Sequence, residues 1–252
     1  MRVAALYRYP VKGLSPEPLE RVRLNPGQFF PGDRLYAVEN GPSGFDPAAP
    51  AHQPKIRFLM LARNARLAGL VTRYDDATST LMIEQDGIRV ACGELATPEG
   101  RGRIERFIEA FCADELRGPA RILAAPDGFR FTDSRSGFVS LINLASVRTI
   151  AHSVGRSLDP LRFRGNLYVT GLAAWREFAL VGKKLRAGSL SLEAIKPIDR
   201  CFAIDVAPGA SSRDTDILPL MERVFGHHDC GIYARIVAGG EIAVRDELVI
   251  GG

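Results

Sequence analysis

The sequence is poor in the residues that mark several common classes of protein. Its 252 residues include only four cysteines, four histidines and one tryptophan. No uncharged apolar run approaches the roughly 18 residues of a membrane-spanning helix. Arg8 and Lys12 interrupt the first apolar stretch before any cleavage site of a secretory signal. We therefore expect a soluble, untargeted protein in the cytoplasm.

The four cysteines form no close pair. Cys92, Cys112, Cys201 and Cys230 stand far apart in the chain, whereas zinc sites and redox dithiols usually contain a CxxC pair. The lack of a secretory signal indicates a reducing compartment, in which cysteines stay free. Neither a zinc site nor a disulfide framework is predicted.

Familiar catalytic signatures are missing as well. The sequence contains no GxxxxGK[ST], GxGxxG, GxSxG or HExxH motif, which disfavours P-loop, Rossmann, α/β-hydrolase and zincin chemistry. The run His227-His228-Asp229-Cys230 offers metal-binding side chains. Neighbouring residues in a turn rarely converge on one ion, and no second cluster completes a ligand set. A polar loop is the better interpretation of this run.

Lysine is scarce and arginine is abundant. The 33 basic residues are 28 arginines and five lysines, set against 29 acidic residues, so the formal net charge is +4. The composition of the genome alone could explain this bias. Alternatively, the arginines bind an anion, because a guanidinium grips phosphate or carboxylate with two hydrogen bonds. They are scattered rather than clustered, which favours a small anionic ligand over a nucleic acid.

Hydrophobic periodicity predicts an α+β fold that is rich in strands, with β-barrel-like sheets and a few helices packed outside them. Helices are expected over residues 103–116, 145–154 and 217–225. The last of these has Asp214 or Asp216 as its cap and Gly226 at its end. The segments expected as strands are 22–24, 35–38, 81–84, 88–90, 190–195, 202–206, 232–237 and 242–244.

Two segments between these elements indicate how the chain is organised. Residues 41–54 hold four prolines and little periodicity, which is typical of a long loop and suggests a lid over a site. A break between two structural modules is expected within residues 126–133. The predicted domains are therefore residues 1–125 and residues 126–252.

Cys201 is the most notable thiol of the four. It follows Pro197-Ile198-Asp199-Arg200 and precedes an alternating apolar segment. A neighbouring arginine favours the thiolate, which would make Cys201 a nucleophile or a ligand for a soft metal. A buried, inert cysteine is the alternative that composition alone favours.

Several motifs, in the same order along nearly the whole chain, resemble one family. The sequence is similar to MOSC proteins, which are named after the C-terminal domain of molybdenum cofactor sulfurase and often carry an N-terminal β-barrel domain. The mitochondrial amidoxime-reducing component and its bacterial relatives have this two-domain layout. The matching segments are Tyr9-Pro10-Val11-Lys12, Gly32-Asp33-Arg34, Arg162-Phe163-Arg164-Gly165-Asn166, Pro197-Ile198-Asp199-Arg200-Cys201, Ser212-Arg213-Asp214 and Gly231-Ile232-Tyr233.

The resemblance implies a site for a molybdenum cofactor between the two domains. By motif position, Cys201 is the molybdenum ligand and the catalytic residue. A thiolate is a soft donor that suits a metal already held by the dithiolene sulfurs of the pterin. Arg63 is a looser match to a family position. The residues implied in cofactor binding are Lys12, Arg34, Asp133, Arg164, Asn166 and Arg200.

The resemblance also implies an activity, namely the two-electron reduction of an N–O bond in a small N-hydroxylated molecule by oxygen-atom transfer. A separate electron-donor protein, ferredoxin-like or a cytochrome-type reductase, is then needed. The reason is that the chain has no flavin, nicotinamide or iron–sulfur motif. Two alternatives stay open. One is a cofactor or sulfur carrier that uses Cys201 without reducing a substrate, and the other is a binding module that has lost the cofactor.

The chain departs from the family pattern at five positions. Gly13 stands where many relatives have serine, Gly165 where proline is common, and Asp199 where serine or threonine is usual. Cys230 replaces an aromatic residue, and Arg245 replaces a glycine in the closing turn. Only Asp199 adjoins the implied metal ligand closely enough to affect the type of substrate.

Overall fold

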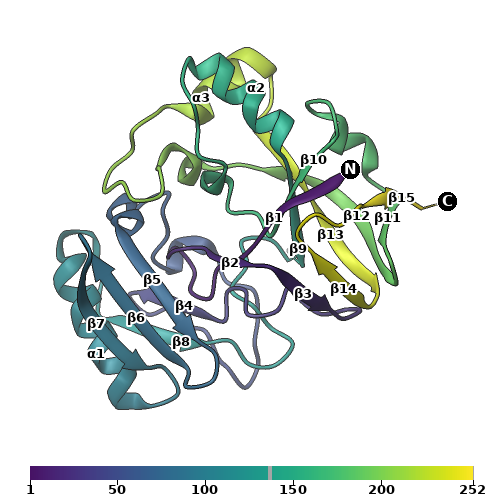
Figure 1. Cartoon of the computed structure of the whole chain (residues 1–252). Helices are drawn as coiled ribbons and strands as arrows, with labels where there is room; N and C mark the ends of the chain where they lie inside the picture. Colours follow the sequence, from purple (N-terminus) through teal and green to yellow (C-terminus); the bar gives the residue numbers. More distant parts are fainter. Residues whose placement is uncertain (136–137, 252) are drawn as a thin grey trace.

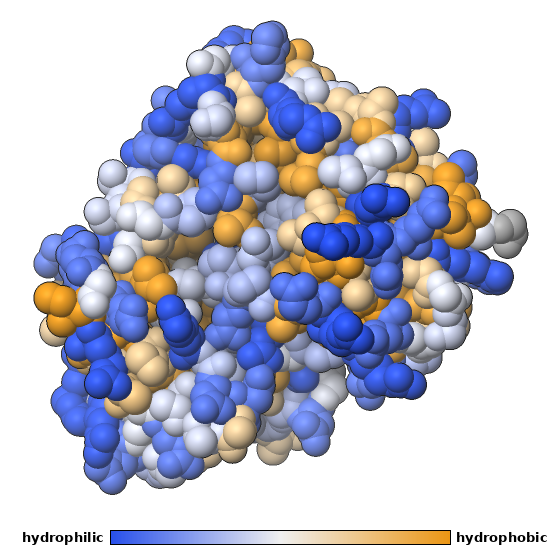
Figure 2. Space-filling view, in the orientation of Figure 1, coloured by the Kyte–Doolittle hydropathy of each residue, from blue (hydrophilic) through white to orange (hydrophobic). Residues whose placement is uncertain are grey.

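The structure is a computed structural model that describes residues 1–135 and 138–251 (Figure 1). It confirms the strand-rich α+β fold, with one large curled sheet, three smaller sheets and three α-helices among the described residues. None of the helices in the described ranges is long and apolar enough to cross a membrane. Hydrophilic and hydrophobic residues are interspersed over the face seen in Figure 2.

The large sheet contains eight strands, in the order β15-β11-β12-β13-β9-β10-β1-β2. Its inward-facing residues form a core in which Val139, Leu141, Leu192 and Ile232 are fully buried. A two-stranded sheet, β3 (Arg21–Leu24) with β14 (Gly240–Ala243), packs on the same core. The eight strands are β1 (Arg2–Arg8), β2 (Glu17–Leu19), β9 (Val139–Asn143), β10 (Leu167–Thr170), β11 (Lys184–Ala187), β12 (Leu190–Asp199), β13 (Asp229–Ala238) and β15 (Val249–Ile250).

The first half of the chain forms a second core beside the large sheet (Figure 1). Its elements are β4 (Tyr36–Asn40), paired with β8 (Ala120–Ala124), and the meander β5 (Leu70–Asp75), β6 (Thr80–Gln85) and β7 (Ile88–Glu94). Asp86 and Gly87 join β6 to β7 as expected, both with φ in the left-handed region that such a tight turn requires.

Helix α1 covers this second core and begins earlier than the sequence predicts. It spans Pro98–Phe111 instead of residues 103–116. Thr97 caps it by accepting a hydrogen bond from the Gly100 backbone N–H, and Pro98 suits the first helical position. Gly100 does not break the helix, because it lets α1 approach β7 closely. A Cβ on Gly100 would lie 2.1 Å from the Glu94 carbonyl oxygen.

Helices α2 (Leu144–Val154) and α3 (Ile217–Phe225) agree with the sequence, and they pack on a third core (Figure 1). Gly226 ends α3 with a left-handed φ of 71°, as expected. Asp216, one of the two residues expected as the cap, stands at the N-cap position, but its side chain makes no capping hydrogen bond. Instead the Asp205 carboxylate accepts from the backbone N–H groups of Ile217 at 2.9 Å and Leu218 at 3.1 Å.

The expected strand over residues 202–206 is also wrong. Phe202–Asp205 is a short 3-10 helix, η6, in which the Ile204 backbone N–H donates to the Cys201 carbonyl oxygen. A short alternation of apolar residues occurs both in strands and in 3-10 helices. Here the hydrogen bonds from the start of α3 to Asp205 stabilise the 3-10 helix. The other short 3-10 helices are η1 (Lys55–Arg57), η2 (Ala65–Gly69), η3 (Ala113–Glu115), η4 (Pro160–Phe163) and η5 (Arg176–Leu180).

Two points bear on the organisation of the chain. Strand β1 pairs with β10, so the start of the chain completes the sheet that the second half builds. The division into residues 1–125 and 126–252 stays a prediction. Residues 41–54 contain no helix or strand, and they lead directly into Lys55, which lines the cavity described next.

Candidate functional site

A cavity of about 460 Å³ lies between the two halves of the chain. Its walls come from the loops after β1 and β4, the segment around Asp133, the 3-10 helix η4, and the end of β12. The structure brings all of the site residues of the sequence analysis to this cavity. They are Lys12, Arg34, Asp133, Arg164, Asn166, Arg200 and Cys201.

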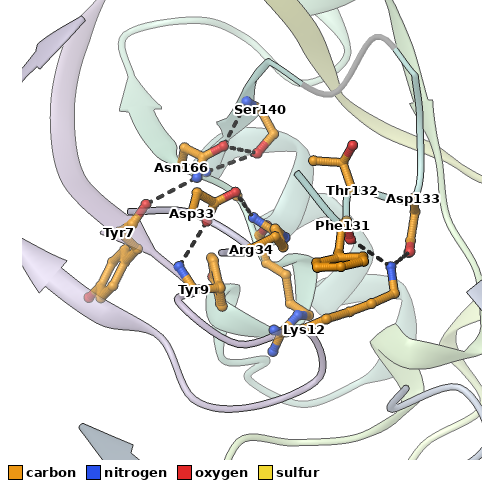
Figure 3. A network of polar contacts seen from close by, with 12 residues as sticks. Tyr7, Tyr9, Lys12, Asp33, Arg34, Phe131, Thr132, Asp133, Ser140 and Asn166 are labelled. Carbon is orange, nitrogen blue, oxygen red and sulfur yellow. Dashed lines mark hydrogen bonds and ion pairs between the residues drawn. The ribbon is translucent and has the colours of Figure 1, made fainter. Parts of the chain in front are cut away.

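Lys12 and Asp133 form an ion pair on one wall (Figure 3). The buried Lys12 ammonium also donates to the Phe131 carbonyl oxygen at 2.9 Å. Burial would raise the pKa of Asp133, but the ammonium of Lys12, helped by Lys55 and Arg34, lowers it to about 2. Burial lowers the pKa of Lys12, and Asp133 opposes this effect. Since 49% of the Asp133 side chain is exposed, its carboxylate can still accept hydrogen bonds from a ligand.

Arg34 and Arg164 both lie over the ring of Tyr9, with guanidinium carbons 4.7 and 4.3 Å from its centroid. Each has φ 48°, in the left-handed region of the backbone. Arg34 pairs with the buried Asp33 (Figure 3). It also donates to the Arg164 carbonyl oxygen at 3.2 Å. Two cations are thus held against one aromatic ring.

Arg164 is the less satisfied of these two arginines. Its Nη2 is buried and has no hydrogen-bond partner among the described residues. Burial, opposed by Tyr9 and reinforced by the charge of Arg34, lowers the pKa of Arg164 to about 10. A buried guanidinium donor without an acceptor is costly, so this atom is available for an anionic ligand.

Asn166 mainly holds the strands of the wall together. Its Oδ1 accepts from the Ser140 backbone N–H at 3.0 Å and the Ser140 hydroxyl at 2.8 Å, while Nδ2 donates to the Tyr7 carbonyl oxygen (Figure 3). The residue thereby links β9, β10 and β1. Among the described residues, Nδ2 donates only to Tyr7, although an amide nitrogen carries two hydrogens.

Arg200 is anchored by backbone carbonyls. Its Nε donates to the Cys230 carbonyl oxygen at 2.8 Å and its Nη1 to the Phe163 carbonyl oxygen at 2.7 Å. Its guanidinium also lies over the Phe163 ring. Arg200 therefore fixes the end of β12, from which Cys201 follows, to the strand and the 3-10 helix beside it.

Cys201 lies half-buried at the start of η6. Burial would lower the pKa of Lys55, which lines the same cavity, but the charges of Cys201, Asp133 and Asp199 raise it. The sequence argument assigned the favourable charge to Arg200 alone and missed Lys55. No motif surrounds Lys55, and only the rarity of lysine in the chain could have drawn attention to it.

Two residues of the family motifs stabilise the cavity wall from behind. Arg162 binds Asp214 through two hydrogen bonds, of 2.8 and 2.5 Å, and these hold the pKa of Asp214 well below its usual range. Arg213 lies over the Phe202 ring and donates to the Ala62 carbonyl oxygen across the two halves of the chain. These contacts fix the segment that follows Cys201.

Other residues considered in the sequence lie away from the cavity. Arg63 is exposed and does not line it. His227 packs against the rings of Trp175 and Phe178. Burial raises the pKa of Cys112 to about 11 and that of Cys230 to about 12, as expected for inert thiols.

The departures from the family pattern have local structural reasons. Gly13 has φ 82°, which a serine would adopt only with strain. A Cβ on Gly165 would lie 2.3 Å from Cγ1 of Ile142, so the isoleucine occupies the space of a larger residue. Arg245 keeps the left-handed backbone that a glycine favours, with φ 79°. The Asp199 side chain is 83% exposed. Cys230 is fully buried in the third core.

Comparison with known families agrees with the motifs. Residues 1–108 match the MOSC N-terminal beta barrel domain, and residues 129–249 match the MOSC domain. The chain therefore belongs to the MOSC-domain proteins that carry the N-terminal barrel domain. It has the two domains that this class combines, in the same order.

Solved structures give only distant likenesses. The YUAD protein from Bacillus subtilis is 12% identical, over 98% of this chain and 93% of that one, with a TM-score of 0.45. YiiM from Geobacillus stearothermophilus is 18% identical, over 47% of this chain, with a TM-score of 0.37. The match covers 56% of that YiiM chain, little more than half of its length. No curated protein matches the chain significantly.

The residues of the cavity fit the molybdenum cofactor with which MOSC domains are associated. That group combines a soft metal, a phosphate and a pterin with ring N–H groups. The cavity offers one accessible thiol, cations around an unpartnered Arg164 Nη2, and an acceptor at Asp133. No cluster of three or more His, Cys, Asp or Glu side chains in the described ranges could hold a metal without such a group.

Proposed function

We propose that the protein binds a molybdenum cofactor in this cavity and reduces N–O bonds of small N-oxygenated molecules by oxygen-atom transfer, as the amidoxime-reducing members of the class do. One observation carries the proposal. Two residues line one cavity of about 460 Å³: Cys201, a half-buried thiol, and Arg164, whose buried Nη2 has no hydrogen-bond partner among the described residues. A thiolate-binding metal and an anion joined in one molecule account for both residues.

The residues divide the binding of that cofactor between them. The Cys201 thiolate would serve as the protein's ligand to the metal. Lys12, Arg34 and Arg164, which surround Tyr9 and Asp133, would bind the phosphate. Asp133, with its exposed carboxylate oxygen, would accept from the N–H groups of the pterin. Arg200 is a positioning residue in this account, because it fixes the backbone beside Cys201.

When bound, the cofactor supplies a redox-active metal that can exchange two electrons and an oxygen atom with a substrate. The N–O bond takes up two electrons and two protons in the net reaction, and its oxygen leaves as water. The chain's residues orient the cofactor and shield it from solvent. The electrons would come from a separate donor protein, because no iron–sulfur or flavin motif occurs in the sequence.

The experiment is a reduction assay on protein isolated from a host that makes the cofactor. An aromatic N-hydroxyamidine is the substrate, chemically reduced methyl viologen supplies the electrons, and the amidine product is quantified. We expect turnover by the native protein and none by Cys201→Ser. Full metal content without turnover would contradict the reductase assignment. A persulfide on Cys201 in place of metal would favour the alternative, a carrier of sulfur or cofactor.

A further inference from the structure

Three of the five lysines of the protein line this one cavity. They are Lys12, Lys55 and Lys196, whereas Lys183 precedes β11 and Lys184 begins it. Arginine outnumbers lysine more than fivefold in the chain. The composition of the chain therefore does not explain why three lysines line one cavity. Their positive charges suggest that the cavity binds an anion.

Two of these lysines lack an anionic partner. Lys12 pairs with Asp133, and the neighbouring Arg34 pairs with Asp33. Among the described residues, no carboxylate lies within ion-pair distance of Lys55 or Lys196. The Lys55 side chain is half-buried, whereas Lys196 is exposed and its ammonium lies 5.9 Å from the centroid of the Tyr233 ring.

Both lysines line the cavity to which Cys201 belongs. Lys196 lies on β12, the strand from whose end Cys201 follows. The charge of the Cys201 sulfur helps to raise the pKa of Lys55, and so do the carboxylates of Asp133 and Asp199. Two of the cations assigned to the cofactor phosphate, Arg34 and Arg164, lie instead over the Tyr9 ring.

The charge balance of the cavity leaves room for a second anion. Seven basic residues and only two acidic ones, Asp133 and Asp199, are among its described lining residues. Arg34 and Arg162 are paired with Asp33 and Asp214 behind the wall, Asp133 is engaged by Lys12, and Asp199 points largely into solvent. The half-buried Lys55 ammonium is unfavourable there unless a ligand supplies a counter-ion. A cavity lined by one sign of charge also concentrates ligands of the other.

We infer that the substrate is an organic anion, with a carboxylate or similar group that Lys55 and Lys196 bind beside Cys201. This inference rests on the proposed function and narrows its substrate class. Lysine suits the role because its ammonium is a compact charge on a flexible stem. A neutral or cationic N-hydroxylated compound would leave both lysines without an anion.

The test compares two probes that differ only in charge. They are an aromatic N-hydroxyamidine that carries a carboxylate, and the methyl ester of the same compound. Calorimetry measures the binding of each to the isolated protein. We expect the acid to bind about tenfold more tightly than the ester, in line with a charge-assisted contact. High salt should reduce this preference, because partly exposed charges are screened.

Two double variants with the same change in net charge provide the control. In K55Q/K196Q the preference for the acid should fall to about twofold or less. What remains is the weak, long-range attraction of the other cations for the carboxylate. In K183Q/K184Q, which changes the two lysines outside the cavity, it should persist. Equal binding of acid and ester by the native protein overturns the inference. It is also overturned if folded K55Q/K196Q keeps the native preference for the acid.

The metal and pterin content of each preparation separates this inference from the proposed function. Native protein without metal and pterin contradicts the proposed function, while calorimetry still measures whether the acid is preferred. Native protein with full cofactor and no preference for the acid contradicts the inference alone.

Discussion

Lys55 and Cys201 line one cavity from different halves of the chain. The charge of the Cys201 sulfur helps to raise the pKa of Lys55 above its usual range. Lys55 follows the proline-rich loop of residues 41–54 directly. The thiol proposed to bind the metal therefore depends on both halves of the fold for its surroundings.

Arg164 should be required to retain the cofactor. Its buried Nη2 lacks a partner, and we expect Arg164→Gln to lose a charge-assisted hydrogen bond worth about 1.5–3 kcal/mol. The equilibrium constant for pterin binding should then fall roughly 10- to 100-fold. The variant should therefore retain less pterin after gel filtration. Arg148, exposed on α2, is the matched control, and Arg148→Gln should keep the native content. Equal content in both variants would refute the assignment of Arg164.

The ion pair of Lys12 and Asp133 should make stability depend on pH in the acid range. The pKa of Asp133 is about 2 in the folded protein and roughly 3.9 in an unfolded chain. A lowered folded pKa gives a stabilisation that is complete above the unfolded value and is lost as the pH falls through the folded one. The native protein should thus lose its advantage over Asp133→Asn between about pH 4 and pH 2.

We expect that advantage to be about 1 kcal/mol near neutral pH, because half of the Asp133 side chain is exposed and solvent screens the pair. Urea unfolding at a series of pH values measures it. Asp127→Asn, at an exposed carboxylate nearby, should show no such loss. An advantage that grows as the pH falls would have the wrong sign for this account.

Asp205 should stabilise α3 although it lies outside the helix in the sequence. Its carboxylate accepts the two backbone N–H groups at the start of the helix, so Asp205→Ala should lower the free energy of unfolding by about 1–2 kcal/mol. Asp216→Ala should cost less than about 0.5 kcal/mol, since the side chain of Asp216 makes no capping bond. Thermal unfolding of the two variants decides between them. The reverse order would restore Asp216 as the cap.

Restoring the family's proline at position 165 should destabilise this protein. Gly165→Pro would push atoms into Ile142 and remove the hydrogen bond from the Gly165 N–H to the Tyr168 hydroxyl. The expected cost is about 1–3 kcal/mol. Ile142→Ala should cost less in the Gly165→Pro background than in the native protein, because alanine lacks Cγ1, the atom nearest to position 165. An equal cost in both backgrounds, measured by urea unfolding, would show that crowding is not the cause.

Local patterns in the sequence predicted much of the fold. The turn at Asp86-Gly87 and the end of α3 at Gly226 follow from glycine's tolerance of a left-handed backbone. The cap of α3 could not be predicted, because Asp205 reaches the helix from a separate turn. The strand expected over residues 202–206 failed for the same reason, since the tertiary anchor of Asp205 overrides a short apolar alternation.

The residues of the candidate site, too, were predicted only in part from the sequence. The motif resemblance pointed to Cys201, Arg34 and Arg164, and the structure brings them to one cavity. Their detailed roles stay proposals. Lys55 could not be predicted, because it follows a loop without periodicity and meets Cys201 only through the packing of the two halves.

The most direct test of the central claim is the molybdenum and pterin content of protein isolated from a host that makes the cofactor. The native protein is measured beside Cys201→Ser and a matched Cys92→Ser, which changes a thiol outside the cavity. The account predicts stoichiometric metal and pterin in the native and Cys92→Ser proteins, and loss of the metal in Cys201→Ser. Folded native protein with neither metal nor pterin would contradict it.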